Sequence, residues 1–307
     1  MTFEQLRTFL AVVDSGNFTE AANVLFMSQP AVSQHISALE KHVGHRLFDR
    51  NGRRLAITLA GERVLTYARQ IVRESDALLA DLKALDVPLQ GYVTLGAINS
   101  VGIYSLPAMI ARFQAAYPSI RVGLKVGNTE RIVDELHRGE VDLALIDSEL
   151  PPSHTRLFRR EPYQEEEQAL IVPPDHPWAG RNDLRLSELY GETWVMRDRR
   201  SHSRQVLELS LAKVGVDVGR LTTALDLDST EAIKQAVGAG LGVGFVPECA
   251  IVRELAWGIL ARAHLKEGRL QRAIWLYSPL RRGIPLRIQA FHDYLQTGEL
   301  SHPAPEA

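Results

Sequence analysis

The chain has 307 residues, of which 45% are hydrophobic and 23% are charged, and its formal net charge is −2. This composition excludes pervasive disorder, because it provides enough apolar surface for a core, and the length predicts two or three domains. The sequence contains no apolar run of about 18 residues and no basic-then-apolar leader. It contains only one cysteine, so an internal disulfide framework is excluded. We therefore expect a cytoplasmic protein, a buried Cys249 and a frayed tail at residues 301–307.

The first 44 residues predict three short helices. Residues 3–14 have the apolar spacing of an amphipathic helix, and Thr19 is the expected cap of a second helix at residues 20–26. Residues 26–28 then form a tight turn. Two helices joined by so short a turn are typical of a helix-turn-helix.

The third helix has an apolar face and a polar face. Ser28 is its expected cap, and Pro30 in the first turn loses no hydrogen bond, because the first N–H groups of a helix have no internal partner. The apolar stripe consists of residues spaced by four, three and four positions: Val32, Ile36, Leu39 and Val43. The polar face could simply be solvated, but its side chains are also of the kind that reads base edges in a major groove.

The segment after this helix predicts a basic wing. Residues 50–54, Arg-Asn-Gly-Arg-Arg, lie between two short apolar runs, and Asn-Gly in that setting indicates a hairpin. Residues 41–54 hold five Lys or Arg and one acidic residue, and concentrated positive charge favours binding to phosphates. Because this positive charge follows the polar face of the third helix directly in the sequence, the two features together predict contact with DNA. The expected contact residues are Thr19, Ser28, Gln29, Pro30, Ser33, Gln34, His35, Ser37, Arg50, Arg53 and Arg54.

The pattern FxxAAxxLxxSQPAVSxxIxxLExxxGxxLFxR spans residues 18–50 and resembles the N-terminal signature of LysR-type transcriptional regulators. Residues 57–59, Ile-Thr-Leu, depart from the usual Leu-Thr-x but keep its apolar and capping character. The resemblance extends in weaker form over nearly the whole chain. It implies a winged helix-turn-helix at residues 1–58, a dimerising linker helix at 59–87 and a two-lobed effector domain at 88–300, similar to type 2 periplasmic binding proteins.

The same resemblance implies the partners. They are double-stranded DNA with an interrupted inverted repeat, a second copy of the chain, a small-molecule effector and, during activation, RNA polymerase. A dimer and a tetramer are both compatible with the sequence, and the resemblance favours the tetramer.

Residues 59–86 predict one long helix, because they contain no proline and Thr58 is a suitable cap. Its apolar residues are separated by alternating fours and threes, which is a heptad seam. An ordinary amphipathic helix that lies on its own domain would show a similar pattern. The resemblance favours dimerisation through Val64, Ala68, Ile71, Leu78, Leu82 and Leu85, and residues 87–91 mark a hinge.

Beyond the hinge, strands and helices alternate, which predicts parallel sheets covered by helices. Strands are expected at residues 92–98, 121–126, 141–146, 169–172, 194–196, 222–227, 243–246 and 273–277, and helices at 106–116, 131–138, 203–214, 230–237, 248–257 and 286–295. Residues 165–167, three glutamates, are interpreted as a solvated strand edge. The resemblance implies crossovers near residues 161–163 and 266–270. These divide the domain into one lobe at about 91–161 and 269–300 and another at about 162–268.

Polar residues follow several predicted strands, where a ligand of an open α/β sheet is expected. Each also suits a helix cap, which is the more frequent role of such residues. Because they converge on one edge near helix N-termini that attract anions, we expect a small organic anion as effector. The expected contacts are Asn99, Ser100, Thr129, Asp147, His202, Ser203 and an apolar wall at Phe245. The family's pockets include the equivalents of Ser100, Thr129 and the loop at His202.

Signals for an enzyme are weak. The glycines of residues 238–244 do not match GxGxxG and lie between a predicted helix and a strand, which reverses the order of a dinucleotide site. We expect no catalytic residue, metal or cofactor. The leading hypothesis is a ligand-responsive transcription factor, and the alternatives are a small-molecule binding protein without a genetic role and a two-domain α/β enzyme.

Overall fold

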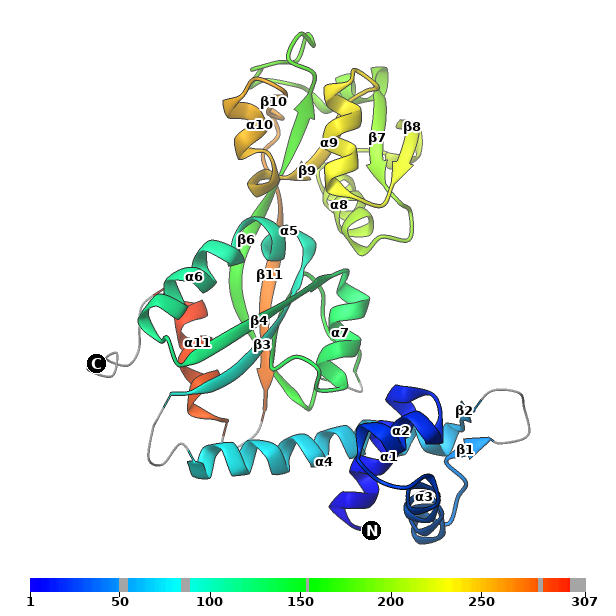
Figure 1. Cartoon of the computed structure of the whole chain (residues 1–307). Coiled ribbons are helices and arrows are strands. Elements are labelled where there is room, and N and C mark those ends of the chain that lie inside the picture. The colour runs from blue at the N-terminus through cyan, green and yellow to red at the C-terminus, as the bar shows by residue number, and fades with distance from the viewer. Residues whose placement is uncertain (50–54, 84–88, 153–154, 281–283, 299–307) are drawn as a thin grey trace. The chain divides into compact units, whose positions relative to one another are not determined.

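The structure is a computed structural model that describes residues 1–49, 55–83, 89–152, 155–280 and 284–298 (Figure 1). The chain divides into two compact units. The first contains residues 1–90 with the short segment 137–140, and the second contains residues 91–136 and 141–307.

The first unit begins with three helices: α1 (Phe3–Ser15), α2 (Phe18–Val24) and α3 (Gln29–Val43). Ser28 caps α3 as expected, and its hydroxyl accepts a hydrogen bond from the backbone N–H of Ala31. The predicted cap of α2 was wrong. Asn17 and not Thr19 fills that role, because the Asn17 side chain accepts from the N–H of Glu20 at 2.6 Å and the helix begins two residues earlier.

We call residues 1–58 the head. The three helices enclose its hydrophobic core. Phe9, Ile36 and Leu39 are fully buried, and each such side chain contributes about 1.5–3 kcal/mol through removal of apolar surface from water. Strand β1 (Phe48–Asp49) pairs in antiparallel fashion with β2 (Ala56–Ile57), so the two sides of the predicted wing lie together. The predicted contacts Arg50, Arg53 and Arg54 lie outside the described residues.

Helix α4 (Leu59–Lys83) starts at Thr58, whose hydroxyl accepts from the N–H of Gly61 at 3.0 Å. The first half of the predicted dimer seam requires a correction. Ala68 is buried in the core of the head, so it packs within its own chain, whereas Val64 and Ile71 are half-buried and pack against the same core. Leu78, further along, is 58% exposed. Leu85 and the side chain of Leu82 lie outside what the structure describes.

The second unit is built on a seven-stranded sheet. Strand β3 (Gly91–Ile98) runs parallel to β4 (Ile120–Gly127) and β5 (Leu143–Ile146), as predicted. Strands β6 (Phe158–Val172) and β11 (Leu270–Pro279) pair in antiparallel fashion. The sheet is therefore mixed rather than parallel, because β11 returns to the first lobe in the direction opposite to β5.

Helices α5 (Asn99–Tyr104), α6 (Leu106–Ala116), α7 (Thr129–His137) and α11 (Leu286–Thr297) accompany the strands of the first lobe. Aromatic packing joins α6 and α11, since the rings of Phe113 and Phe291 lie 4.7 Å apart between centroids. Helix α5 was not predicted, because its residues follow β3 directly and resemble a capping loop.

The second lobe contains η1 (Leu186–Gly191), β7 (Thr193–Arg197), α8 (His202–Lys213), η2 (Val218–Arg220), β8 (Thr222–Leu227), α9 (Thr230–Gly238), β9 (Gly244–Pro247), η3 (Glu248–Ala250), α10 (Val252–Ala256) and β10 (Ala261–Ala263). The prediction of one helix over residues 248–257 was wrong. Ile251, which is fully buried, leaves helical geometry at φ −119° and separates η3 from α10.

Strands β6 and β11 run side by side from one lobe into the other (Figure 1). The carboxyl end of β6 pairs with β9 and β10, and its remaining length pairs with β11. Residues 165–167 lie in this central strand, and the expectation of a solvated edge was wrong for Glu166 and Glu167, whereas Glu165 is exposed. Glu166 is 4% exposed, and the side chain of Glu167 is 9% exposed.

Candidate effector pocket and DNA-binding face

A pocket lies where the carboxyl ends of β3 and β4 meet residues of the second lobe. Six of the seven predicted effector contacts line it: Asn99, Ser100, Thr129, His202, Ser203 and Phe245. Asp147, the seventh, is buried beside the pocket and holds the hydroxyl of Thr129 at 2.7 Å. The predicted residues therefore come together in the folded chain, although they come from five separate segments.

Four helices begin at the pocket. Asn99, Thr129, His202 and Thr230 are the first residues of α5, α7, α8 and α9, and all four line it. The residues before α8 and α9, Ser201 and Ser229, form no capping hydrogen bond through their side chains. The first N–H groups of a helix carry partial positive charge, so this convergence favours an anion.

Arg272 forms the buried floor of the pocket. Its guanidinium donates to Asp147 Oδ2 at 2.7 Å, to Glu166 Oε2 at 2.7 Å and to the hydroxyl of Ser100 at 3.0 Å. The three charged side chains are at most 4% exposed. Because two carboxylates surround one guanidinium, Arg272 has no positive charge left over for a ligand.

His202 connects the two lobes at this floor. Its Nε2 lies 3.4 Å from the backbone oxygen of Asp147 and 3.6 Å from Oδ1 of the same residue. His202 starts α8 in the second lobe, whereas Asp147 follows β5 in the first. A polar contact between the two lobes thus lies at the pocket, at His202.

Arg197 supplies the available positive charge. It stands at the end of β7 and lines the pocket, and its buried Nε has no hydrogen-bond partner among the described residues. Burial lowers the pKa of Arg197, and the neighbouring carboxylate of Asp228 acts in the opposite direction. A buried donor without a partner is unfavourable unless a ligand supplies the acceptor. No local pattern in the sequence indicated a role for this residue.

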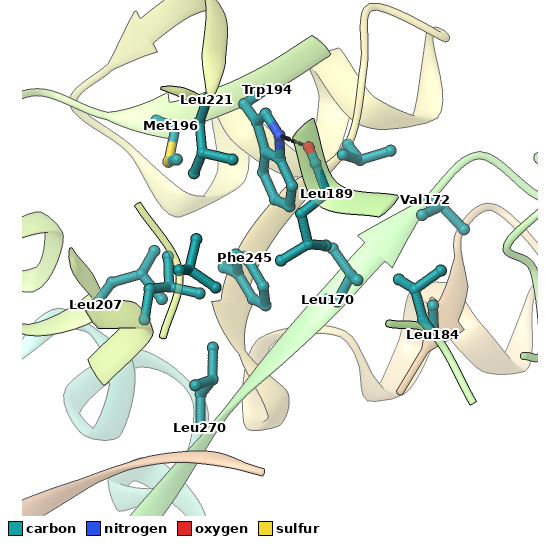
Figure 2. Close-up of a cluster of buried hydrophobic side chains, with 14 of the residues drawn as sticks. Leu170, Val172, Leu184, Leu189, Trp194, Met196, Leu207, Leu221, Phe245 and Leu270 are labelled. Carbon is teal, nitrogen blue, oxygen red and sulfur yellow. Dashed lines mark hydrogen bonds between the residues drawn. The ribbon is translucent and has the colours of Figure 1, made fainter. Parts of the chain in front are cut away.

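The apolar wall of the pocket is anchored in the core of the second lobe (Figure 2). The ring of Phe245 stacks on Trp194 with a centroid separation of 5.3 Å and an interplanar angle of 10°. Trp194 donates from its indole N–H to the backbone oxygen of Leu189 at 2.9 Å. Because Trp194 is fully buried and hydrogen-bonded, Phe245 meets the pocket from a fixed position.

Cys249 lies close to the charged floor but is not a reactive group. Its sulfur is 3.7 Å from Glu166 Oε1. Burial, together with the charge of Glu166, raises the pKa of the Cys249 thiol to about 12. The nucleophilic thiolate is therefore almost absent near neutral pH.

The described part of the DNA-binding face is largely open to solvent. Ser28, Gln29, Pro30, Gln34, Ser37 and Thr19 are exposed, and Ser33 is half-buried. His35 differs from the others, because its Nδ1 lies 3.0 Å from the hydroxyl of Thr8 in α1. One ring nitrogen of His35 is thus engaged within the head.

Comparisons with known proteins agree with this architecture. The family model described as "Bacterial regulatory helix-turn-helix protein, lysR family" matches residues 3–62, and "LysR substrate binding domain" matches residues 87–299. A probable RuBisCO transcriptional regulator of Cyanidioschyzon merolae is 37% identical over 274 residues, covering 89% of this chain and 90% of the relative. One of Trichormus variabilis is 37% identical over 278 residues, covering 90% and 82%.

Two solved structures are informative. The CcmR regulatory domain of Synechocystis in complex with 2-PG is 28% identical, with a TM-score of 0.60, covering 70% of this chain and all of that one. Full-length CbnR complexed with its target DNA is 22% identical, with a TM-score of 0.67, covering 96% and 99%, and it shares the fold. The chain belongs to the LysR family. It is a DNA-binding transcriptional regulator whose second domain binds an effector.

Proposed function

We propose that this regulator responds to a small organic anion bound between the two lobes of its effector domain. The observation that carries the proposal is the convergence of four helix N-termini on a pocket that Arg197 also lines, and the buried Nε of Arg197 has no hydrogen-bond partner among the described residues. Arg272 is neutralised by its own carboxylates, so Arg197 is the cation that faces the ligand. Phe245 contacts the apolar part of the same molecule.

The relatives support a more specific assignment. The 28% identical CcmR domain was solved in complex with 2-PG, and relatives at 37% identity are named probable RuBisCO transcriptional regulators. We assign 2-PG, or an anion of similar size, to the pocket and RuBisCO genes to the set that the protein controls. The chain acts in the cytoplasm, where DNA, polymerase and metabolites meet.

The DNA-binding assignment rests on the exposed start of α3. Gln29, Ser33 and Gln34 read base edges, and Pro30 offers apolar contact to a thymine methyl group. Two heads on a two-fold axis bind an interrupted inverted repeat, and Leu78 contributes to the contact between copies. The assembly is a tetramer that contacts RNA polymerase when it activates transcription.

The test of the anion assignment is isothermal titration calorimetry of the full chain with 2-PG, succinate, inorganic phosphate and neutral glycerol. We expect at least one organic anion to bind and glycerol not to bind. Arg197→Met should weaken that binding about tenfold or more, because a charge-assisted hydrogen bond is lost. Arg200→Met is the matched control, since this side chain is 94% exposed, and it should change the affinity less than twofold, roughly. Equal effects of the two substitutions, or binding of glycerol alone, would contradict the proposal.

A further inference from the structure

The turn between α2 and α3 contains a residue in an unusual conformation. Phe26 has a φ of 53°, and Leu89 is the only other non-glycine residue with positive φ in the described part of the chain. The N–H of Met27 donates to the backbone oxygen of Ala22 at 2.9 Å, and the N–H of Phe26 donates to that of Asn23 at 3.2 Å. These two bonds define a Schellman motif, in which the left-handed position is normally occupied by glycine or asparagine. A phenylalanine there is strained, because its Cβ crowds the backbone.

The side chain of Phe26 is also fully open to solvent. It is 98% exposed, the largest fraction among the exposed large hydrophobic residues, whereas its neighbour Met27 packs against the core of the head. The turn therefore directs the side chain of Phe26 outward and that of Met27 inward. Neither the conformation nor the exposure of Phe26 stabilises the isolated chain.

Both features occur beside the part of the head that binds DNA. Phe26 lies two residues before Ser28, the cap of α3, and the exposed residues Gln29 and Pro30 follow directly. In a helix-turn-helix, the first turn of the second helix enters the major groove. An apolar ring at this position lies within reach of the groove edge, where thymine presents its C5-methyl group.

We propose that Phe26 is a specificity-determining residue of the head, whose ring packs against a thymine methyl group at the edge of the major groove. Contact with DNA removes the ring from water, and the free energy gained by this burial offsets the strain of the left-handed backbone. This inference rests on the DNA-binding role of the head. It adds a residue outside the recognition helix α3 to those that recognise the DNA sequence.

The test compares Phe26→Gly with Phe26→Ala in the full-length protein. Glycine removes the ring and relieves the backbone, whereas alanine removes the ring and keeps the strained conformation. A duplex is first selected from random DNA with the wild-type protein, so that wild-type binding is established before any variant is tested. Each thymine of the selected site is then replaced by deoxyuracil, which removes only the methyl group, and affinities are measured by fluorescence anisotropy.

We expect both variants to bind the selected duplex about tenfold more weakly than wild type. One deoxyuracil replacement should weaken wild-type binding about fourfold, which corresponds to one buried methyl group, and should have no effect on either variant. Phe26→Gly should also raise the melting temperature of the head by about 4 °C, because strain is relieved.

Three outcomes would overturn the proposal. Wild-type affinity in both variants would show that the ring does not contact DNA. An undiminished response of the variants to every deoxyuracil would place the methyl contacts on other residues. A lower melting temperature of Phe26→Gly would show that the ring supports the fold.

Discussion

At the scale of single residues, Arg272 shows why part of the site could not be predicted. Its partners Glu166, Asp147 and Ser100 are 106, 125 and 172 positions away in the chain. Ser100 and Thr129 were predicted because a polar residue at the end of a strand is a local signal. A salt bridge across such separations leaves no local pattern, so Glu166 was interpreted as solvated and Arg272 was missed.

The buried floor predicts a large effect of substitution at Arg272. Arg272→Leu leaves the carboxylates of Asp147 and Glu166 buried without their cation, and we expect the effector domain to lose about 3–5 kcal/mol of unfolding free energy. The measurement is urea-induced unfolding of the full chain followed by tryptophan fluorescence.

Arg269→Ala provides the control for this substitution. Arg269 is 70% exposed and reaches Glu167 at 3.3 Å, so its removal should change the unfolding free energy by less than about 0.5 kcal/mol. If Arg272→Leu were as mild as this control, the salt bridges of the floor would not contribute to stability.

At the scale of elements, the periodicity of apolar residues predicted most helices and strands. It could not predict whether an apolar stripe packs on its own domain or on a second copy of the chain. The seam of α4 illustrates this point. Ala68 belongs to the core of its own head, whereas Leu78 is exposed, although both fit one heptad pattern. The break between η3 and α10 was missed for a related reason, since Ile251 fits a helical pattern but turns into the core.

This division of α4 predicts two different phenotypes. Ala68→Leu overfills the core of the head and should lower its unfolding free energy by about 1–3 kcal/mol. Leu78→Glu places a charge on an exposed surface, so it should leave the stability of the head within about 0.5 kcal/mol of wild type. It should also weaken self-association, which sedimentation velocity would detect as a shift to smaller species.

Tyr67→Ala serves as the comparison, because Tyr67 is 66% exposed and lies outside the predicted seam. Unchanged sedimentation of Leu78→Glu would show that this side chain is not part of the contact between copies.

At the scale of the whole molecule, the two lobes of the effector domain share their strands. Strand β6 supplies Ala169 and Leu170 to cores of the second lobe, and along its remaining length it pairs with β11. Strand β11 pairs with β5 in the first lobe and supplies Leu270 to a core of the second. Neither lobe therefore has a complete set of strands of its own.

We expect the effector domain to unfold as one cooperative unit for this reason. Native-state hydrogen exchange of the full chain, followed by mass spectrometry in increasing denaturant, is the measurement. Peptides from β5 and β9 should lose protection at the same denaturant concentration. Loss of protection in β9 well before β5 would indicate that the lobes are independent.

The shared strands also limit how such a regulator is engineered or diversified by recombination. A graft that joins the lobe of one homologue to that of another must cut both β6 and β11 within the stretch where the two strands pair with each other. A junction at Gly91, where β3 begins, separates no paired strands. We therefore expect chimeric regulators to fold when the entire effector domain is exchanged between homologues, and to fail to fold when only one of its lobes is exchanged.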